Sequence, residues 1–108
     1  RVYTSVVSRA GKDRGILDAG SKALTSDQGG LNGFGFIQEY PDASIHKLAE
    51  EHGFLNLVNC AVKPSVGEIV RVIPNHVCVV VNMFRELVLV RDAEIIDVIK
   101  VEARGMLV

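Results

Sequence analysis

The sequence predicts an all-β fold, a small closed or partly open β-barrel of about seven strands. Valine and isoleucine make up 25 of the 108 residues, and β-branched side chains favour strands over helices. The apolar segments are short and are separated by turn-forming residues, which is typical of small barrels. The length suits one domain over residues 1–108 with a core of its own.

The first part of the chain contains three predicted strands and a long loop. Residues 2–7 are β-branched and predict a strand, and residues 15–17 predict a second, shorter one. Residues 25–35 are rich in glycine, serine, asparagine and aspartate, so they predict a surface loop. The aromatic residues of the segment 34–40 are two or four positions apart, as on one face of a third strand.

The middle segment, residues 45–58, fits two predictions. Ile45, Leu48 and His52 fall at helical spacing, and the local pattern favours this helix. The same window also fits two strands that are joined by a turn at Glu50–Gly53.

The last part of the chain predicts four strands. Residues 67–73 form one, with Val70 and Val72 on the side opposite to their neighbours. The apolar, β-branched residues 76–81 form another, and a short helical turn after Cys78 is the alternative. Two further strands, 86–90 and 94–101, surround a short hairpin loop.

Composition excludes several classes of protein. The 12 basic and 13 acidic residues give a net charge of −1, which lacks the basic surface of a nucleic-acid-binding protein. The longest apolar run, Val77–Val81, is far too short to cross a membrane, and the N-terminus does not resemble a signal peptide.

Cys60 and Cys78 predict two reduced thiols in a cytoplasmic protein, although a single bridge between them is geometrically possible. The chain starts with Arg1 rather than methionine, so we expect it to be part of a longer protein.

The strongest candidate site is the triplet His76-Val77-Cys78. Residues two apart share one face of a strand, so His76 and Cys78 are expected to project together while Val77 and Val79 pack on the other side. Imidazole and thiolate are both good Zn²⁺ ligands, and two ligands suit an open site that water or substrate completes. The alternative is a buried cysteine beside a hydrogen-bonded histidine.

The residues around this triplet carry a family resemblance. Pro74–Cys78, followed by Val81-Asn82, resembles a signature of the D-serine dehydratase / D-threonine aldolase family, pyridoxal-phosphate enzymes built like alanine racemase. Further segments agree in the same order, and they span nearly the whole chain: Val6–Arg9, Asp18–Leu24, Asp27 with Gly29, Gly33–Gly35, Glu50–Gly53, Val66-Gly67, Val90–Asp92 and Ala103–Gly105.

The resemblance implies that the chain is the C-terminal β-domain of such an enzyme, with a fold like the C-terminal domain of alanine racemase. In the family this domain packs against an N-terminal TIM-type barrel, which carries the cofactor lysine and is absent here. The residues that match His76 and Cys78 bind Zn²⁺ or another divalent metal. A cysteine at the second position resembles the dehydratase branch, whereas many aldolases have aspartate there. The resemblance also favours the hairpin over the helix at 45–58.

The resemblance further implies a lyase that acts on D-3-hydroxy amino acids, by β-elimination as in D-serine dehydratase or by retro-aldol cleavage as in D-threonine aldolase. The resemblance also implies a homodimer. A non-catalytic binding or dimerisation module is the alternative from another class. The family often has Pro-Thr where this chain has Val79-Val80, so a substrate contact from that position is in doubt.

No catalytic or cofactor-binding residue is expected in this chain, because none of its lysines matches the family's cofactor lysine. The isolated chain is therefore expected to be inactive and to bind no pyridoxal phosphate. Asn75, Asp18 and Lys22 are weaker candidates for contacts with substrate or behind the metal ligands. For Asp18 and Lys22 the alternative is a turn-capping aspartate and a surface lysine, and for Glu50–His52 a structural role at a hairpin tip.

Overall fold

The computed structural model describes residues 1–102. These residues form eight strands and two short helices, in the order β1 (Val2–Ser8), β2 (Arg14–Leu17), α1 (Ser21–Leu24), β3 (Phe36–Ile37), β4 (Ser44–Leu48), β5 (Gly53–Asn56), β6 (Ile69–Ile73), α2 (Val77–Val81), β7 (Glu86–Arg91) and β8 (Glu94–Lys100). The segment Ala103–Gly105, which contributed to the family resemblance, lies outside the described residues.

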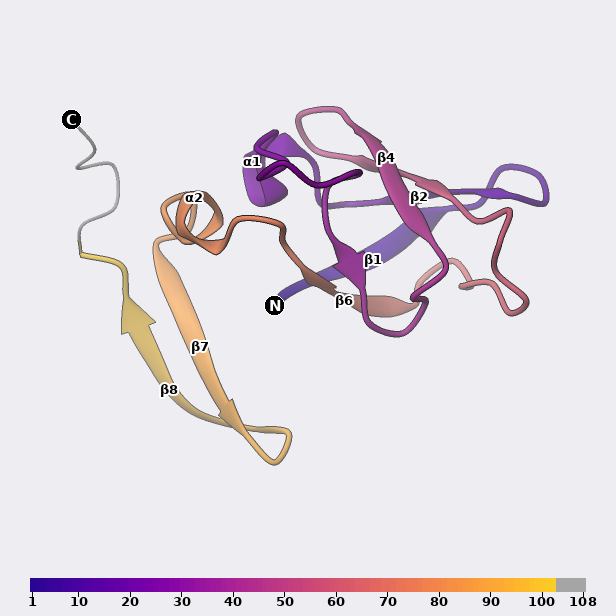
Figure 1. Ribbon diagram of the computed structural model, residues 1–108. Coiled ribbons are helices and arrows are strands. Elements are labelled where there is room, and N and C mark those ends of the chain that lie inside the picture. Colours follow the sequence, from indigo (N-terminus) through magenta and orange to yellow (C-terminus); the bar gives the residue numbers. More distant parts are fainter. Residues whose placement is uncertain (103–108) are drawn as a thin grey trace.

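Six of the described strands form one antiparallel sheet in the order β3-β6-β1-β2-β5-β4. The sheet curls until its two edges meet. At this junction the backbone N–H of Phe34, beside β3, donates to the carbonyl of Ile45 in β4 at 3.1 Å. Figure 1 shows the strands wrapped around a common interior. The predicted all-β, partly open barrel is thus confirmed.

The ambiguous segment is a hairpin and not a helix. Strands β4 and β5 pair with each other, and β5 also pairs with β2 on its other side. Ile45 and Leu55 stand opposite each other in this ladder, and both are fully buried. The segment forms strands despite its helical spacing, because β5 has a partner strand on each side with which its backbone groups form hydrogen bonds.

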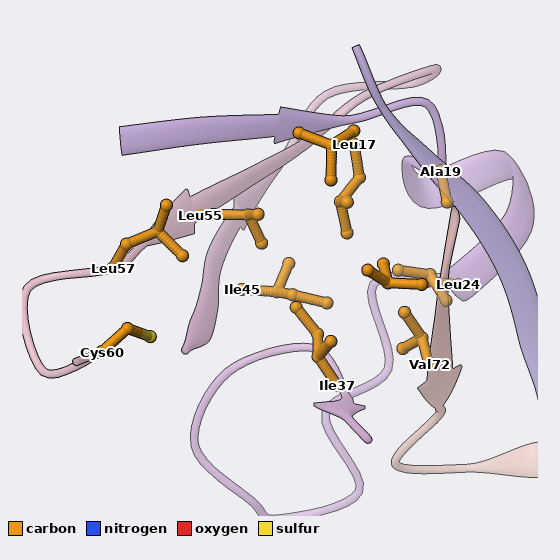
Figure 2. Close-up of a cluster of buried hydrophobic side chains, with 11 residues drawn as sticks. Leu17, Ala19, Leu24, Ile37, Ile45, Leu55, Leu57, Cys60 and Val72 are labelled. Carbon is orange, nitrogen blue, oxygen red and sulfur yellow. The ribbon is translucent and has the colours of Figure 1, made fainter. Parts of the chain in front are cut away.

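The core consists of inward-facing residues from alternate positions of the barrel strands. Figure 2 shows these side chains converging on Ile45 and Ile37. In β6, Val70 and Val72 are buried and their neighbours are not, as predicted. The buried cluster comprises Val6, Leu17, Ala19, Leu24, Ile37, Ile45, Leu55, Leu57, Cys60, Val70 and Val72.

The predicted strand over 34–40 is much shorter than expected. Only Phe36 and Ile37 pair with β6, and Phe36 is exposed while Ile37 is buried. Gly35 adopts a φ of +142°, and a Cβ there would lie 2.7 Å from a methyl carbon of Val72. A strand that began at Phe34 would need a regular backbone at Gly35, and this packing does not allow it.

The predicted strand over 76–81 is wrong, because residues Val77–Val81 form the short helix α2. The alternative, a short helical turn after Cys78, is closer to the structure, although the helix begins one residue before Cys78. Strand β6 loses its partner after Ile73 pairs with Phe36, and Pro74 offers no backbone N–H to extend the ladder. The next residues satisfy their backbone locally, as when Asn82 N–H donates to the carbonyl of Cys78. Valine packing also differs from the prediction, since Val80 is buried and Val77 is exposed.

The last two strands form a hairpin of their own, as the sequence predicted, but they lie outside the barrel. Strands β7 and β8 pair only with each other within the described chain. Figure 1 shows them extending away from the six-stranded sheet, beyond α2. Every residue of both strands is exposed, including eight large apolar side chains: Leu87, Val88, Leu89, Val90, Ile95, Ile96, Val98 and Ile99.

Between residues 1 and 102, no helix has the length and apolar character needed to span a bilayer.

Candidate metal site

The segment before α2 is joined to the long loop 25–35 by the side chain of Asn75. Its amide nitrogen donates to the carbonyl of Gln28 at 3.1 Å and to that of Gly33 at 2.9 Å. Gly29 lies next to the backbone of Asn75, and its φ of +59° is in the left-handed region that favours glycine. Two segments more than 40 residues apart in sequence therefore meet at the start of α2.

His76 contacts a carboxylate from this loop. Its Nδ1 lies 2.6 Å from Oδ2 of Asp27, and both side chains are about two-fifths exposed, at 42% and 41%. The other carboxylate oxygen of Asp27 accepts the backbone N–H of Gly29 at 2.9 Å. The hydrogen bond with His76 lowers the pKa of Asp27, so this side chain is a carboxylate at neutral pH.

Cys78 follows in the first turn of α2. It is an exposed free thiol, and His76 immediately precedes the helix in an extended conformation. The two candidate ligands thus share one end of α2, although they do so at a strand-to-helix junction and not on a strand. Within the described residues, no group of three or more His, Cys, Asp or Glu side chains is arranged to hold a metal.

The donor set fits a divalent metal of intermediate softness. An imidazole and a thiolate match the preferences of Zn²⁺, and both groups are at the surface, where a cation can reach them. Two protein donors leave coordination positions open for water or substrate, as in catalytic rather than structural zinc sites.

Asp18 links the end of β2 to β1. Its Oδ1 accepts the hydroxyl of Thr4 and the backbone N–H of Ser5 at 2.8 Å, and the bond from Thr4 lowers its pKa. It therefore ties the end of β2 to β1, a structural role between two strands and not the turn cap that the sequence offered as the alternative. A contact between Asp18 and substrate stays a prediction.

Lys22 lies on the surface of α1 and contacts the β4–β5 turn. Its Nζ is 2.7 Å from Glu51 and 3.4 Å from Glu50, and the bond with Glu51 raises the pKa of Lys22. Glu50 and Glu51 accordingly act at the hairpin tip, as expected from the sequence. The predicted contact of Lys22 with substrate is not addressed by these interactions.

Cys60, the second cysteine, is buried, unlike Cys78. Cys60 is a buried free thiol beside an open surface hollow of about 340 Å³, which is also lined by Tyr40 and Asp42. Burial raises the pKa of Cys60, so the thiol is protonated and unreactive at neutral pH.

Tyr40 makes the fold sensitive to alkaline pH. Burial and the hydrogen bond that its hydroxyl donates to Glu68 at 2.7 Å raise the pKa of Tyr40 to about 12. The folded state therefore favours the protonated hydroxyl, and this stabilisation is complete below about pH 10 and is lost as the pH rises toward 12. We expect the urea midpoint to fall between pH 10 and 12 and to fall less in Tyr40→Phe. An identical fall in both proteins would contradict this assignment.

The sequence did not identify Asp27 as a site residue. It is 49 positions from His76, so no local spacing connects the two. The available signal was the Asp27-Gln28-Gly29 pattern in a turn-rich loop, where an aspartate commonly caps the N–H two residues on.

Comparison with known proteins places this geometry in a family. A family model described as "Putative serine dehydratase domain" matches residues 1–90. The chain belongs to this family. The match includes the whole barrel, α2 and both candidate ligands, which confirms the resemblance that the sequence motifs carry.

The matched domain fills most of one relative and about a quarter of another. An uncharacterized protein of Mycobacterium tuberculosis (strain ATCC 25618 / H37Rv) is 44% identical over 96% of this chain and 82% of its own length. A D-threonine aldolase of an Arthrobacter species is 35% identical over 96% of this chain, which spans only 26% of the aldolase.

Solved structures share the fold. D-threonine aldolase from Filomicrobium marinum superposes with a TM-score of 0.85 at 26% identity, over 98% of this chain and 28% of that one. A D-threo-3-hydroxyaspartate dehydratase, in a metal-free form with one cysteine replaced by alanine, superposes with a TM-score of 0.75 at 21% identity, over 91% of this chain and 30% of that one. At this lower identity the likeness concerns the fold alone.

Proposed function

We propose that this chain is the metal-binding C-terminal domain of a pyridoxal-phosphate lyase that acts on D-3-hydroxy amino acids. The observation that carries the proposal is the pair of donors at the start of α2, an imidazole held by a carboxylate and an exposed thiol two residues later. The family match adds the class of enzyme. The parent enzyme's activity, its substrate and its pyridoxal phosphate all belong to this proposal, because the chain spans about a quarter of the aldolases it matches.

In this proposal His76 and Cys78 hold a divalent cation at the edge of an active site. A bound cation would act as a Lewis acid toward the β-hydroxyl of the substrate. The chain's own residues bind the cation, leave part of its coordination open, and present it on a short helix that the 25–35 loop braces through Asn75. Thiolate and neutral imidazole are the binding forms, so metal affinity falls in acid.

β-Elimination from a substrate such as D-serine is the reaction we favour. Cys78 supports it, because a cysteine at this position resembles the dehydratase branch, whereas many aldolases have aspartate there. Retro-aldol cleavage is the second candidate, and the 35% identity with an Arthrobacter D-threonine aldolase favours it. Both reactions would use the same metal and the same substrate hydroxyl.

The hairpin β7–β8 supports a further domain as partner. Eight exposed large apolar side chains on 13 strand residues exceed what a free surface ordinarily carries. The aldolases that this chain matches are about four times as long, so most of their length is protein that this chain lacks. The family resemblance implies that this additional length includes an N-terminal TIM-type barrel, which could cover the apolar side chains. We therefore propose this barrel as the occupant, with a homodimer as the assembled state.

A binding or dimerisation module is the candidate from another class. It is favoured by the mycobacterial relative, because the matched domain fills 82% of that protein. Such a chain has little room for a second large domain.

The two free cysteines agree with a reducing compartment, so the cytoplasm remains the proposed location.

Metal binding by the purified chain tests the proposal directly. We expect the chain to bind about one Zn²⁺, and we expect His76→Ala and Cys78→Ala each to lose affinity on the order of 100-fold, because each removes a ligand. Competition with a chromogenic chelator measures the affinity, and substitution by Co²⁺ reports a thiolate bond through its charge-transfer absorption.

His46→Ala is the matched control for this experiment, because His46 is an exposed histidine on β4. It should bind Zn²⁺ as the unmodified chain does. Equal affinity in all four proteins would refute the metal site at His76 and Cys78.

A further inference from the structure

We propose that Asp27 is the positioning residue of this metal site: it fixes the ring of His76 so that Nε2 is the atom that binds the metal. This inference rests on the proposed function. It assigns a role to a residue of the 25–35 loop for which neither the motif spacing nor the family match supplies one.

The first step is the proton on the imidazole. A carboxylate can only accept hydrogen bonds, so the 2.6 Å contact with Oδ2 of Asp27 requires that Nδ1 of His76 carries the hydrogen and donates it. A neutral imidazole has a single N–H, and its Nε2 therefore keeps a free lone pair. The contact selects the tautomer whose Nε2 can bind a cation.

The second step is the position of the carboxylate. Oδ1 of Asp27 accepts the backbone N–H of Gly29 at 2.9 Å, so the two carboxylate oxygens have different partners and the group cannot rotate freely. The loop itself is fixed to the segment before α2 by the two hydrogen bonds from Asn75. Asp27 therefore aims the ring from a braced support.

The loop is also fixed on its other side. The backbone N–H of Phe34, at the end of the loop, donates to Ile45 in β4 and closes the barrel. The loop that carries Asp27 is therefore hydrogen-bonded both to the barrel and to the segment that carries His76. Metal-binding histidines commonly donate their second ring N–H to a carboxylate, which orients the ring and strengthens the ligand.

Stability alone does not account for the pair. A contact between side chains this exposed contributes little to stability, and both partners here are about two-fifths exposed. The ordering of the ring is what the arrangement achieves, and it matters only if Nε2 has a partner to bind.

Nuclear magnetic resonance of the ring nitrogens tests the positioning without any metal. In the ¹⁵N-labelled chain at pH 8 we expect His76 to be in the Nδ1–H form. In Asp27→Ala the ring should shift toward the Nε2–H form, which free histidine prefers. Asp27→Asn retains an oxygen acceptor and should restore the Nδ1–H form, a rescue that a purely structural role would not produce.

Zinc affinity gives the second readout. Loss of a partner behind a metal ligand typically costs 10–100-fold in affinity, so we expect a fall of this size in Asp27→Ala and a smaller one in Asp27→Asn. Asp42→Ala removes an exposed carboxylate of equal charge elsewhere and should leave the affinity unchanged. The backbone amide signals of Gly33 and Phe34 show whether the loop is still in place.

The outcomes separate the two ideas. If His76→Ala binds zinc as the unmodified chain does, the proposed metal site is wrong. If His76→Ala loses zinc while Asp27→Ala keeps both the Nδ1–H form and full affinity, the metal site stands and the positioning role of Asp27 is wrong.

Discussion

Gly20→Ala is expected to destabilise the domain by about 3 kcal/mol, through a clash that the backbone cannot relieve. A Cβ at Gly20 would lie 2.3 Å from the carbonyl oxygen of Ala49 and 2.5 Å from the backbone N of His52. Its φ of −109° is accessible to any residue, so strain in the dihedral angle is not the cause. The cause is the close approach of two backbone segments.

This approach matters because it docks α1 on the β4–β5 turn. The N–H of Ser21 donates to Ala49 at 2.8 Å, and that of Lys22 donates to Glu50 at 3.1 Å. A clash at Gly20 would break both bonds or push the turn away from the barrel. We expect the urea midpoint to fall accordingly, with an unchanged slope if unfolding stays cooperative.

Gly15→Ala provides the comparison within the same barrel. A Cβ at Gly15 would meet side-chain carbons of Leu55 and Arg9 at 3.2 and 3.3 Å, and these can move by a few tenths of an ångström. We expect a loss of less than about 1 kcal/mol there. Equal stability of Gly20→Ala and the unmodified chain would mean that the turn is not packed against Gly20 as described.

The barrel strands were predictable because their local and tertiary preferences agree. In β6, β-branched residues alternate between a buried and an exposed face, and the sequence alone indicates this pattern. Segment 45–58 was different, since helical spacing and strand pairing competed there; the family resemblance favoured the hairpin, and the structure confirms it. Pairing with β2 decided the outcome, and composition cannot show which strand will be a neighbour.

Helix α2 was predicted as a strand, so here the local sequence preference was misleading. Its five residues include four valines, so the local preference is for a strand. The preference had no effect because β6 has no partner strand to continue with beyond Ile73. The separate hairpin β7–β8 was predicted as two strands, but nothing in its sequence distinguishes a barrel strand from one that extends outward.

The candidate site was predicted in part, and partly for a wrong reason. His76 and Cys78 were paired by the side-chain alternation of a strand, whereas they stand at the start of a helix. Their exposure at one end of α2 keeps the metal prediction open to test. Asp27 required the structure, because the loop that carries it reaches His76 only through tertiary hydrogen bonds.

Ile45→Ala is expected to have the largest effect on stability, about 4 kcal/mol, because it leaves a cavity in the middle of the core. Ile45 is fully buried, and it lies among the converging side chains beside Ile37 (Figure 2). Its backbone carbonyl also accepts the N–H of Phe34, the bond at which the two edges of the sheet meet. If the core collapses into the cavity, we expect the hydrogen bond between Phe34 and Ile45, which we call the seam of the barrel, to weaken, and the end of the 25–35 loop to shift with it.

Two measurements separate these effects. Urea unfolding gives the loss of stability, and hydrogen exchange at the amide of Phe34 reports opening of the seam, which should be faster in Ile45→Ala than the loss of global stability alone explains. Ile69→Ala removes the same atoms from the outer face of β6, where the side chain is 62% exposed, and should cost less than about 0.5 kcal/mol. Similar losses in both variants would contradict the assignment of Ile45 to the core. If the seam supports the loop as we infer, Ile45→Ala should also loosen the contact between Asp27 and His76, and zinc affinity should fall even though neither residue was changed.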